Sequence, residues 1–205
     1  MLSNKAIVCR LYSGILVVIW ILAPYAILQH VEIREVLWMP QTAIDKAIPV
    51  CFSAVWVYFS FYLLLAIVGL TVEKKYFIRY LYTIGWATAV CHAFFLFLPN
   101  GAERSEIPAG AGNWLYQWLI AVDKPRNAMP SLHATLSVIA AIAVQKSALF
   151  KPALKVVTWL WVVAIFWSTI ALRQHVVIDL AVASVIAPLA WFFVGRSAEM
   201  KYHGV

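Results

Sequence analysis

The sequence has little charge. Only 12% of its 205 residues are Asp, Glu, Lys or Arg, and 64% are hydrophobic, whereas ordinary soluble domains have about 25% and about 45–50%. It also lacks internal repeats and any linker rich in Gly/Ser, Pro or charge. These absences exclude a soluble protein and favour one integral membrane domain over residues 1–205.

The short alternating strands of a membrane β-barrel are also absent. In lipid, every backbone polar group must be hydrogen-bonded within the structure. With a barrel excluded, α-helices are the membrane-spanning structure that is left. A helix needs about 20 apolar residues to cross about 30 Å of hydrocarbon. We therefore predict an all-α polytopic membrane protein, with six transmembrane helices in one bundle. The runs lie at about 11–28, 49–71, 77–98, 130–148, 153–173 and 175–195.

The first run has a competing interpretation as a secretory signal, because Lys5 and Arg10 precede or open it. Its apolar length and the lack of a small-residue cleavage site favour a membrane span. Cysteine is scarce: Cys9, Cys51 and Cys91 have no metal-ligand spacing. No metal and no cofactor are expected.

The distribution of Lys and Arg predicts the orientation, since cytoplasmic segments carry the excess. The N-terminus, two turns and the C-terminal tail hold ten of the sixteen cations: Lys5, Arg10, Lys74, Lys75, Arg79, Lys146, Lys151, Lys155, Arg196 and Lys201. Both termini are therefore predicted to be cytoplasmic. The long connections 29–48 and 99–129 would face the periplasm or an organelle lumen. The absence of N-x-[ST] sequons and the cysteine usage favour a bacterial inner membrane.

The net charge of +7 indicates attraction to anionic membrane lipids. A nucleic-acid partner is not expected, because no basic patch is separate from the membrane turns. The sequence does not indicate an oligomeric state.

Polar groups at membrane depth are costly, so they point to a cavity and a partner. His175 and Asp179 are four residues apart, which places them on one face of a helix. The carboxylate would orient one ring nitrogen and leave the other as a nucleophile or proton acceptor. The alternative is a buried pair that only holds two helices together.

A second cluster opens the run at 130–148. Ser131 is expected to cap the helix, with Pro130 just outside it. The N–H groups and dipole of a helix N-terminus attract anions, and His133 lies in that first turn. A lone histidine there is also compatible with a structural or solvated role.

By the predicted topology, both clusters lie on the non-cytoplasmic side. They can converge with several cations: Arg104, Lys124, Arg126 and Arg173. Two histidines, a carboxylate, a helix N-terminus and cations around one space suit phosphoryl transfer, which depends on positioning and charge neutralisation.

These residues resemble the type 2 phosphatidic acid phosphatase (PAP2) superfamily. The resemblance rests on PSLH (130–133) and STIALRQHVVIDL (168–180), with weaker support from LPNGAERSEI (98–107). It implies a metal-independent mechanism through phosphohistidine: His175 attacks phosphorus, Asp179 orients it, and His133 protonates the leaving oxygen. Ser131 and the following amides would hold phosphate oxygens.

The chain departs from the family pattern in two motifs. The third motif keeps Ser168, but Thr169 occupies the arginine position, and the arginine is Arg173. Because these positions are four apart, we expect them on the same helix face, with Arg173 serving the phosphate. The first motif has Phe97 where lysine is usual. Arg104 there is followed by Ser105, so Lys124 and Arg126 either replace its phosphate contacts or bind headgroups.

The resemblance implies a lipid phosphatase that hydrolyses a phosphomonoester or pyrophosphate of a phospholipid or polyprenyl lipid. RQH (173–175), with Asp123, Pro125 and Asn127 before PSLH, is similar to inositol phosphorylceramide synthase-like members, so transfer to an alcohol is the alternative. A non-enzymatic transporter or scaffold with a proton relay is a second alternative. A metal-dependent hydrolase using the same side chains is a third.

Overall fold

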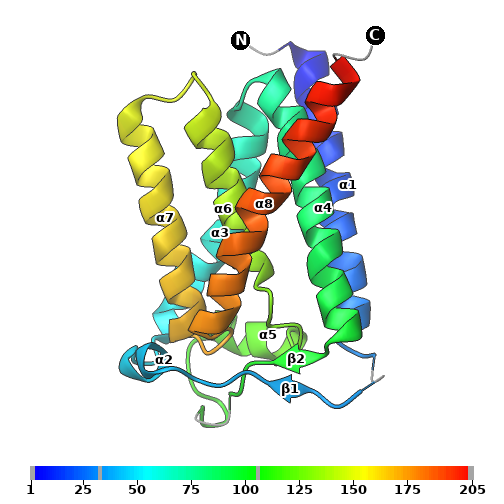
Figure 1. Cartoon of the computed structure of the whole chain (residues 1–205). Coiled ribbons are helices and arrows are strands. Elements are labelled where there is room, and N and C mark those ends of the chain that lie inside the picture. The colour runs from blue at the N-terminus through cyan, green and yellow to red at the C-terminus, as the bar shows by residue number, and fades with distance from the viewer. Residues whose placement is uncertain (1–2, 32–33, 105–106, 203–205) are drawn as a thin grey trace.

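The structure, a computed structural model, describes residues 3–31, 34–104 and 107–202, and from residue 196 onward the backbone alone. Ser105 of the altered first motif lies outside the described residues, as do the side chains of Arg196 and Lys201, which contributed to the predicted orientation. The described chain is mostly helical (Figure 1).

Among the residues that the structure describes, five helices are long and apolar enough to cross a membrane. They are α1 (Asn4–Leu28), α3 (Val55–Thr71) with a preceding 3₁₀ turn η1 (Phe52–Ala54), α4 (Lys74–Phe97), α7 (Pro152–Ala171) and α8 (Val177–Tyr202). Five of the six predicted runs therefore correspond to such helices, which indicates insertion into a membrane. Helix α1 begins well before the predicted residue 11, because the Oγ of Ser3 accepts a hydrogen bond from the Ala6 N–H and caps it.

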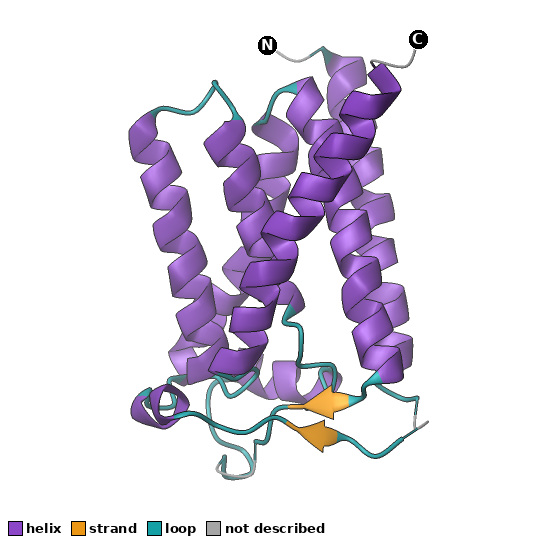
Figure 2. Ribbon diagram, in the orientation of Figure 1, coloured by secondary structure: helices purple, strands orange, loops and turns teal. Residues whose placement is uncertain are grey.

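The run predicted at 130–148 forms a shorter helix, α6 (Leu132–Lys146), of 15 residues. This is less than the roughly 20 residues that a lone helix needs to span hydrocarbon. Most of α6 is buried, and the chain ahead of it rises between the ends of the other helices before α6 begins (Figures 1 and 2). The first turn of α6 therefore lies inside the bundle.

The helix ends fall into two groups (Figure 1). The first turn of α1, the α3–α4 and α6–α7 turns and the last turn of α8 lie at one end of the bundle. The two long connections and the turn between α7 and α8 lie at the other. The predicted catalytic residues, which start α6 and α8, are therefore on the side of the long connections.

Those connections contain elements that an all-α prediction omits. Strand β1 (Leu37–Trp38) pairs in parallel with β2 (Asn100–Gly101), and the connections also contain the short helices α2 (Ala43–Ala47) and α5 (Trp114–Val122) (Figure 1). A Cβ on Gly101 would clash with the carbonyl oxygen of Pro125 and the ring of Trp38. Glycine thus allows the segment before α6 to pack against β2.

One buried apolar cluster draws on all six long or central helices, α1, α3, α4, α6, α7 and α8. Helix α1 is the least buried of them, with only Arg10 and Ile21 enclosed. Hydrogen bonds hold its two ends instead: Arg10 donates to the carbonyls of Gly69 (2.9 Å) and Val72 (2.8 Å) at one end. At the other end, α1 meets the segment that precedes α6.

Candidate active site

The pair predicted from the H-x-x-x-D spacing is formed at the start of α8. The Nδ1 of His175 lies 3.4 Å from the Oδ2 of Asp179. His175 precedes the first helical residue, and the carboxylate reaches back because Oδ2 also accepts the Val176 N–H at 3.0 Å. Asp179 is fully buried and His175 nearly so. With Nδ1 facing the carboxylate, Nε2 is the ring nitrogen left for chemistry.

A residue that the sequence analysis missed fixes the N-terminus of α8. Asp45 in α2 is buried, and its Oδ1 accepts the Val177 N–H at 2.8 Å. Asp45 also forms a capping box with Thr42. Thr42-x-x-Asp45 is a local capping signal, but its contact with α8 is a tertiary one.

The prediction that Thr169 and Arg173 share a helix face is wrong. Helix α7 ends at Ala171, and Arg173 has a left-handed φ of 56°. Its Nη1 donates to the carbonyls of Asp45 at 3.1 Å and Ile170 at 3.3 Å. Within the described chain, Arg173 does not line the pocket that holds the two histidines. These bonds instead brace the turn between α7 and α8.

His133 lies in the first turn of α6, which Ser131 caps as predicted. The Oγ of Ser131 accepts the Ala134 N–H at 3.3 Å. The Nδ1 of His133 lies 3.4 Å from the hydroxyl of Tyr58, and its ring packs against the Tyr58 ring with centroids 4.2 Å apart. Its Nε2 is buried and has no hydrogen-bond partner among the residues that the structure describes.

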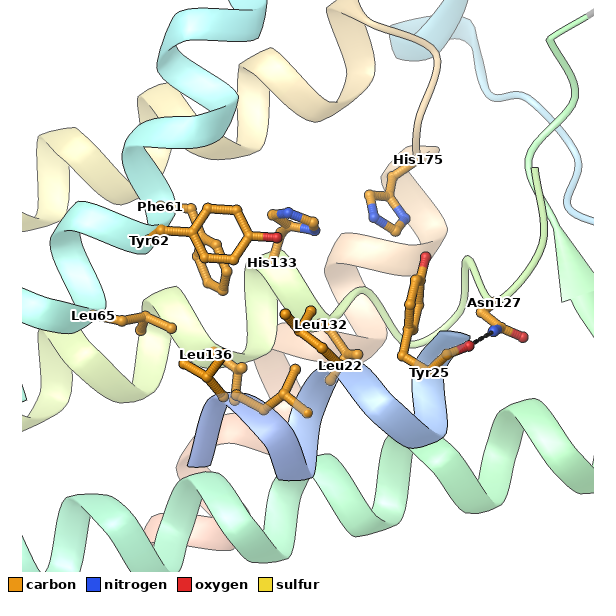
Figure 3. Close-up of a pocket in the computed structure, with 12 residues that line it drawn as sticks. Leu22, Tyr25, Phe61, Tyr62, Leu65, Asn127, Leu132, His133, Leu136 and His175 are labelled. Carbon is orange, nitrogen blue, oxygen red and sulfur yellow. Dashed lines mark hydrogen bonds between the residues drawn. The ribbon is translucent and has the colours of Figure 1, made fainter. Parts of the chain in front are cut away.

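The two histidines face one pocket (Figure 3), with ring centroids 6.0 Å apart. Buried polar atoms without partners are rare in proteins. In the described part of the chain, three such atoms belong to the predicted site residues: His133 Nε2 in the pocket, Asp179 Oδ1 in the pair with His175, and Arg104 Nε next to Gln174. The site therefore has hydrogen-bonding capacity that the rest of the protein does not use.

Arg104, the predicted cation of the first motif, contacts Gln174, the residue that precedes His175. Its Nη1 donates to the carbonyl of Asp123 at 2.7 Å, and its Nη2 donates to the side-chain oxygen of Gln174. Nη2 also lies 3.7 Å from the Asp123 carboxylate. Burial raises the pKa of Asp123, while the Arg104 guanidinium opposes that shift. Gln174 thus links Arg104 to the segment that carries His175.

Like Arg104 and Arg173, the other two predicted cations are not among the described residues that line the pocket. Lys124 is exposed, and its Nζ lies 2.9 Å from the Nδ1 of His30. Arg126 is half-buried, and its backbone N–H donates to the carbonyl of Lys124.

Two asparagines that were not predicted as site residues shape the segment before α6. Asn100 is fully buried, and its side chain pairs with both the N–H and the carbonyl of Met129. Asn127, with a left-handed φ of 59°, donates its backbone N–H to the Asn100 carbonyl at 2.8 Å. Asn127 also lines the pocket. These bonds hold the loop that delivers His133 into the bundle.

Beyond the histidines, the pocket is mostly apolar (Figure 3). Its polar lining consists of the two histidines, Tyr25, Tyr62 and Asn127. Aliphatic and aromatic side chains from α1, α3 and α6 complete it: Val18, Ile21, Leu22, Phe61, Leu65, Leu132 and Leu136. The site joins a histidine pair to a surface that suits a hydrocarbon chain.

Comparison with known proteins gives no relative. No family model, no curated protein and no solved structure matches the chain.

Proposed function

We propose that the chain is a metal-independent lipid phosphatase that works through a phosphohistidine intermediate, as its resemblance to the PAP2 superfamily implies. The observation that carries the proposal is the histidine pair in its pocket. His175 is oriented by Asp179, and His133 faces it with an unpartnered Nε2, at the polar end of an apolar crevice.

In the first step, Nε2 of His175 attacks the phosphorus of a lipid phosphate and the bond from phosphorus to the leaving oxygen breaks. His133, protonated at Nε2, gives that proton to the leaving oxygen. Asp179 stabilises the positive ring that forms on His175. Arg104 and the N-terminus of α6, capped by Ser131, neutralise the phosphate oxygens. In the second step, the phosphoryl group passes from His175 to water.

The proposal includes the membrane arrangement. Helix α6 is the sixth pass, shortened because the other helices surround it and the loop held by Asn100 enters from one side. Both termini are cytoplasmic by the distribution of Lys and Arg, and the site faces the periplasm or a lumen. We assign the protein to a bacterial inner membrane.

Transfer to an alcohol shares the first step and differs only in the acceptor. Asn127, part of the pattern similar to inositol phosphorylceramide synthase-like members, lies in the pocket lining, so this alternative is kept as the second candidate.

The test is phosphate release by purified, detergent-solubilised protein from phosphatidate, lysophosphatidate and polyprenyl phosphates and pyrophosphates, with excess chelator. We expect release from at least one lipid phosphate at the same rate with and without chelator. Loss of release on chelation would instead support a metal-dependent hydrolase. No release from any lipid, with or without alcohols, would favour a transporter or scaffold.

The two arginines should differ in their effects. Arg104→Ala is expected to lower kcat/KM about 10²-fold or more, because a donor to the phosphate oxygens is lost. Arg173→Ala should lower kcat/KM less and mainly lower the Tm, because its Nη1 bonds brace a buried turn. Steady-state kinetics and thermal unfolding of both variants check this. A larger loss of kcat/KM in Arg173→Ala than in Arg104→Ala would instead identify Arg173 as the phosphate ligand.

A further inference from the structure

Tyr25 of α1 is a pocket residue that the mechanism above does not use. Its hydroxyl donates a hydrogen bond to the Oδ1 of Asp123 at 2.9 Å. In Figure 3 the hydroxyl end of Tyr25 points toward His175. Both side chains line the pocket together with His133. The tyrosine hydroxyl therefore belongs to the same pocket as the ring that would carry the phosphoryl group.

The surroundings fix which way the Tyr25 proton points. The Oδ1 of Asp123 also accepts from the Nε2 of Gln29 at 3.1 Å, and its Oδ2 lies 3.7 Å from Arg104. The Tyr25 hydroxyl donates its only hydrogen to Asp123. The lone pairs on its oxygen therefore face the pocket as hydrogen-bond acceptors.

From this geometry we propose that Tyr25, held by Asp123, positions the water that discharges phosphorylated His175. The inference rests on the proposed function and names its acceptor. Water has two O–H bonds, so it can donate one to His133 Nε2 and the other to the Tyr25 oxygen at the same time. An alcohol has one O–H at the attacking oxygen and can satisfy only one of them. The site thereby favours hydrolysis over transfer.

The water oxygen forms a bond to phosphorus, the bond from phosphorus to His175 Nε2 breaks, and its electron pair returns to the ring. The water proton facing His133 moves to Nε2, which lost its own proton to the leaving group. The second water proton stays on the product phosphate, hydrogen-bonded to Tyr25. His175 ends as the neutral ring with its Nδ1 proton toward Asp179.

The experiment measures how the phosphoenzyme divides between two acceptors. Purified protein turns over a lipid phosphate in buffer containing methanol, and phosphorus NMR gives the ratio of methyl phosphate to inorganic phosphate. Tyr25→Phe should raise that ratio about tenfold, the effect of losing one hydrogen bond to water. The ratio counts only molecules that turn over, so it is insensitive to the amount of folded protein.

Tyr80→Phe is the matched control. Tyr80 is also buried and is not among the described residues that line the pocket; its hydroxyl donates at 3.3 Å to the backbone carbonyl of Leu65, a residue of the apolar lining. It should leave the ratio unchanged. An unchanged ratio in Tyr25→Phe, even with slower turnover, would overturn the inference while leaving the proposed function intact. Failure of the wild-type protein to form either product would overturn both.

Discussion

A His175→Ala variant is expected to release no phosphate above background from lipid phosphates that the wild-type protein hydrolyses. Alanine removes the nucleophile, and loss of a nucleophile that forms a covalent intermediate costs about 10⁴-fold or more in kcat. Asp179 is then left buried beside a small apolar side chain, so the variant should also be less stable. The measurement is phosphate release at saturating substrate, with folding checked by circular dichroism and size exclusion.

His92→Ala gives the matched control, because His92 is a buried histidine in α4 outside the pocket lining that the structure describes. It should keep most of the activity. If His175→Ala retained the wild-type rate, or if both variants lost activity equally, His175 would not be the nucleophile.

A His133→Ala variant is expected to lose about 10²–10⁴-fold in kcat on lipid phosphates, the usual effect of removing a general acid. The loss should depend on the leaving group. An aryl phosphate with a strongly acidic phenol needs little protonation of its leaving oxygen. The substitution should therefore slow the first step of its hydrolysis much less. The comparison of kcat for alkyl and aryl phosphates, in wild type and variant, checks this.

Equal losses on both kinds of substrate would argue against a proton donor. His133 would then serve to shape the pocket, where its ring packs between Tyr58 and Phe61 with centroids 4.2 and 4.6 Å away. Tyr58→Phe adds a second readout, since the Tyr58 hydroxyl lies 3.4 Å from Nδ1 of His133. It should slow alkyl phosphates more than aryl ones if that contact supports the acid.

Local sequence patterns predict the local parts of this structure. The apolar runs predict the five long helices, and Ser131 ahead of an apolar run predicts the N-cap of α6. The i,i+4 spacing gives the contact between His175 and Asp179. The length of α6 is less predictable, since the run from 130 to 148 is apolar almost throughout. The helix begins at Leu132, after its Ser131 cap, and ends at Lys146, while Asn100 holds the preceding loop through Met129.

Contacts between distant segments account for what the sequence does not predict. Asp45 and Val177 are 132 positions apart, and Tyr25 and Asp123 are 98 apart. No periodicity links such pairs. Arg173 shows the limit of spacing arguments: four residues after Thr169 predicts a shared helix face, but the helix ends two residues earlier and the arginine turns toward α2.

The most direct test of the account is to identify the residue that carries the phosphoryl group. Purified protein is mixed with a lipid phosphate that carries radiolabelled phosphorus, quenched in alkali within the first turnover and digested to peptides. The account predicts an alkali-stable, acid-labile label on His175 that is absent from the His175→Ala variant. A label on another residue, or turnover without any labelled protein, would contradict it.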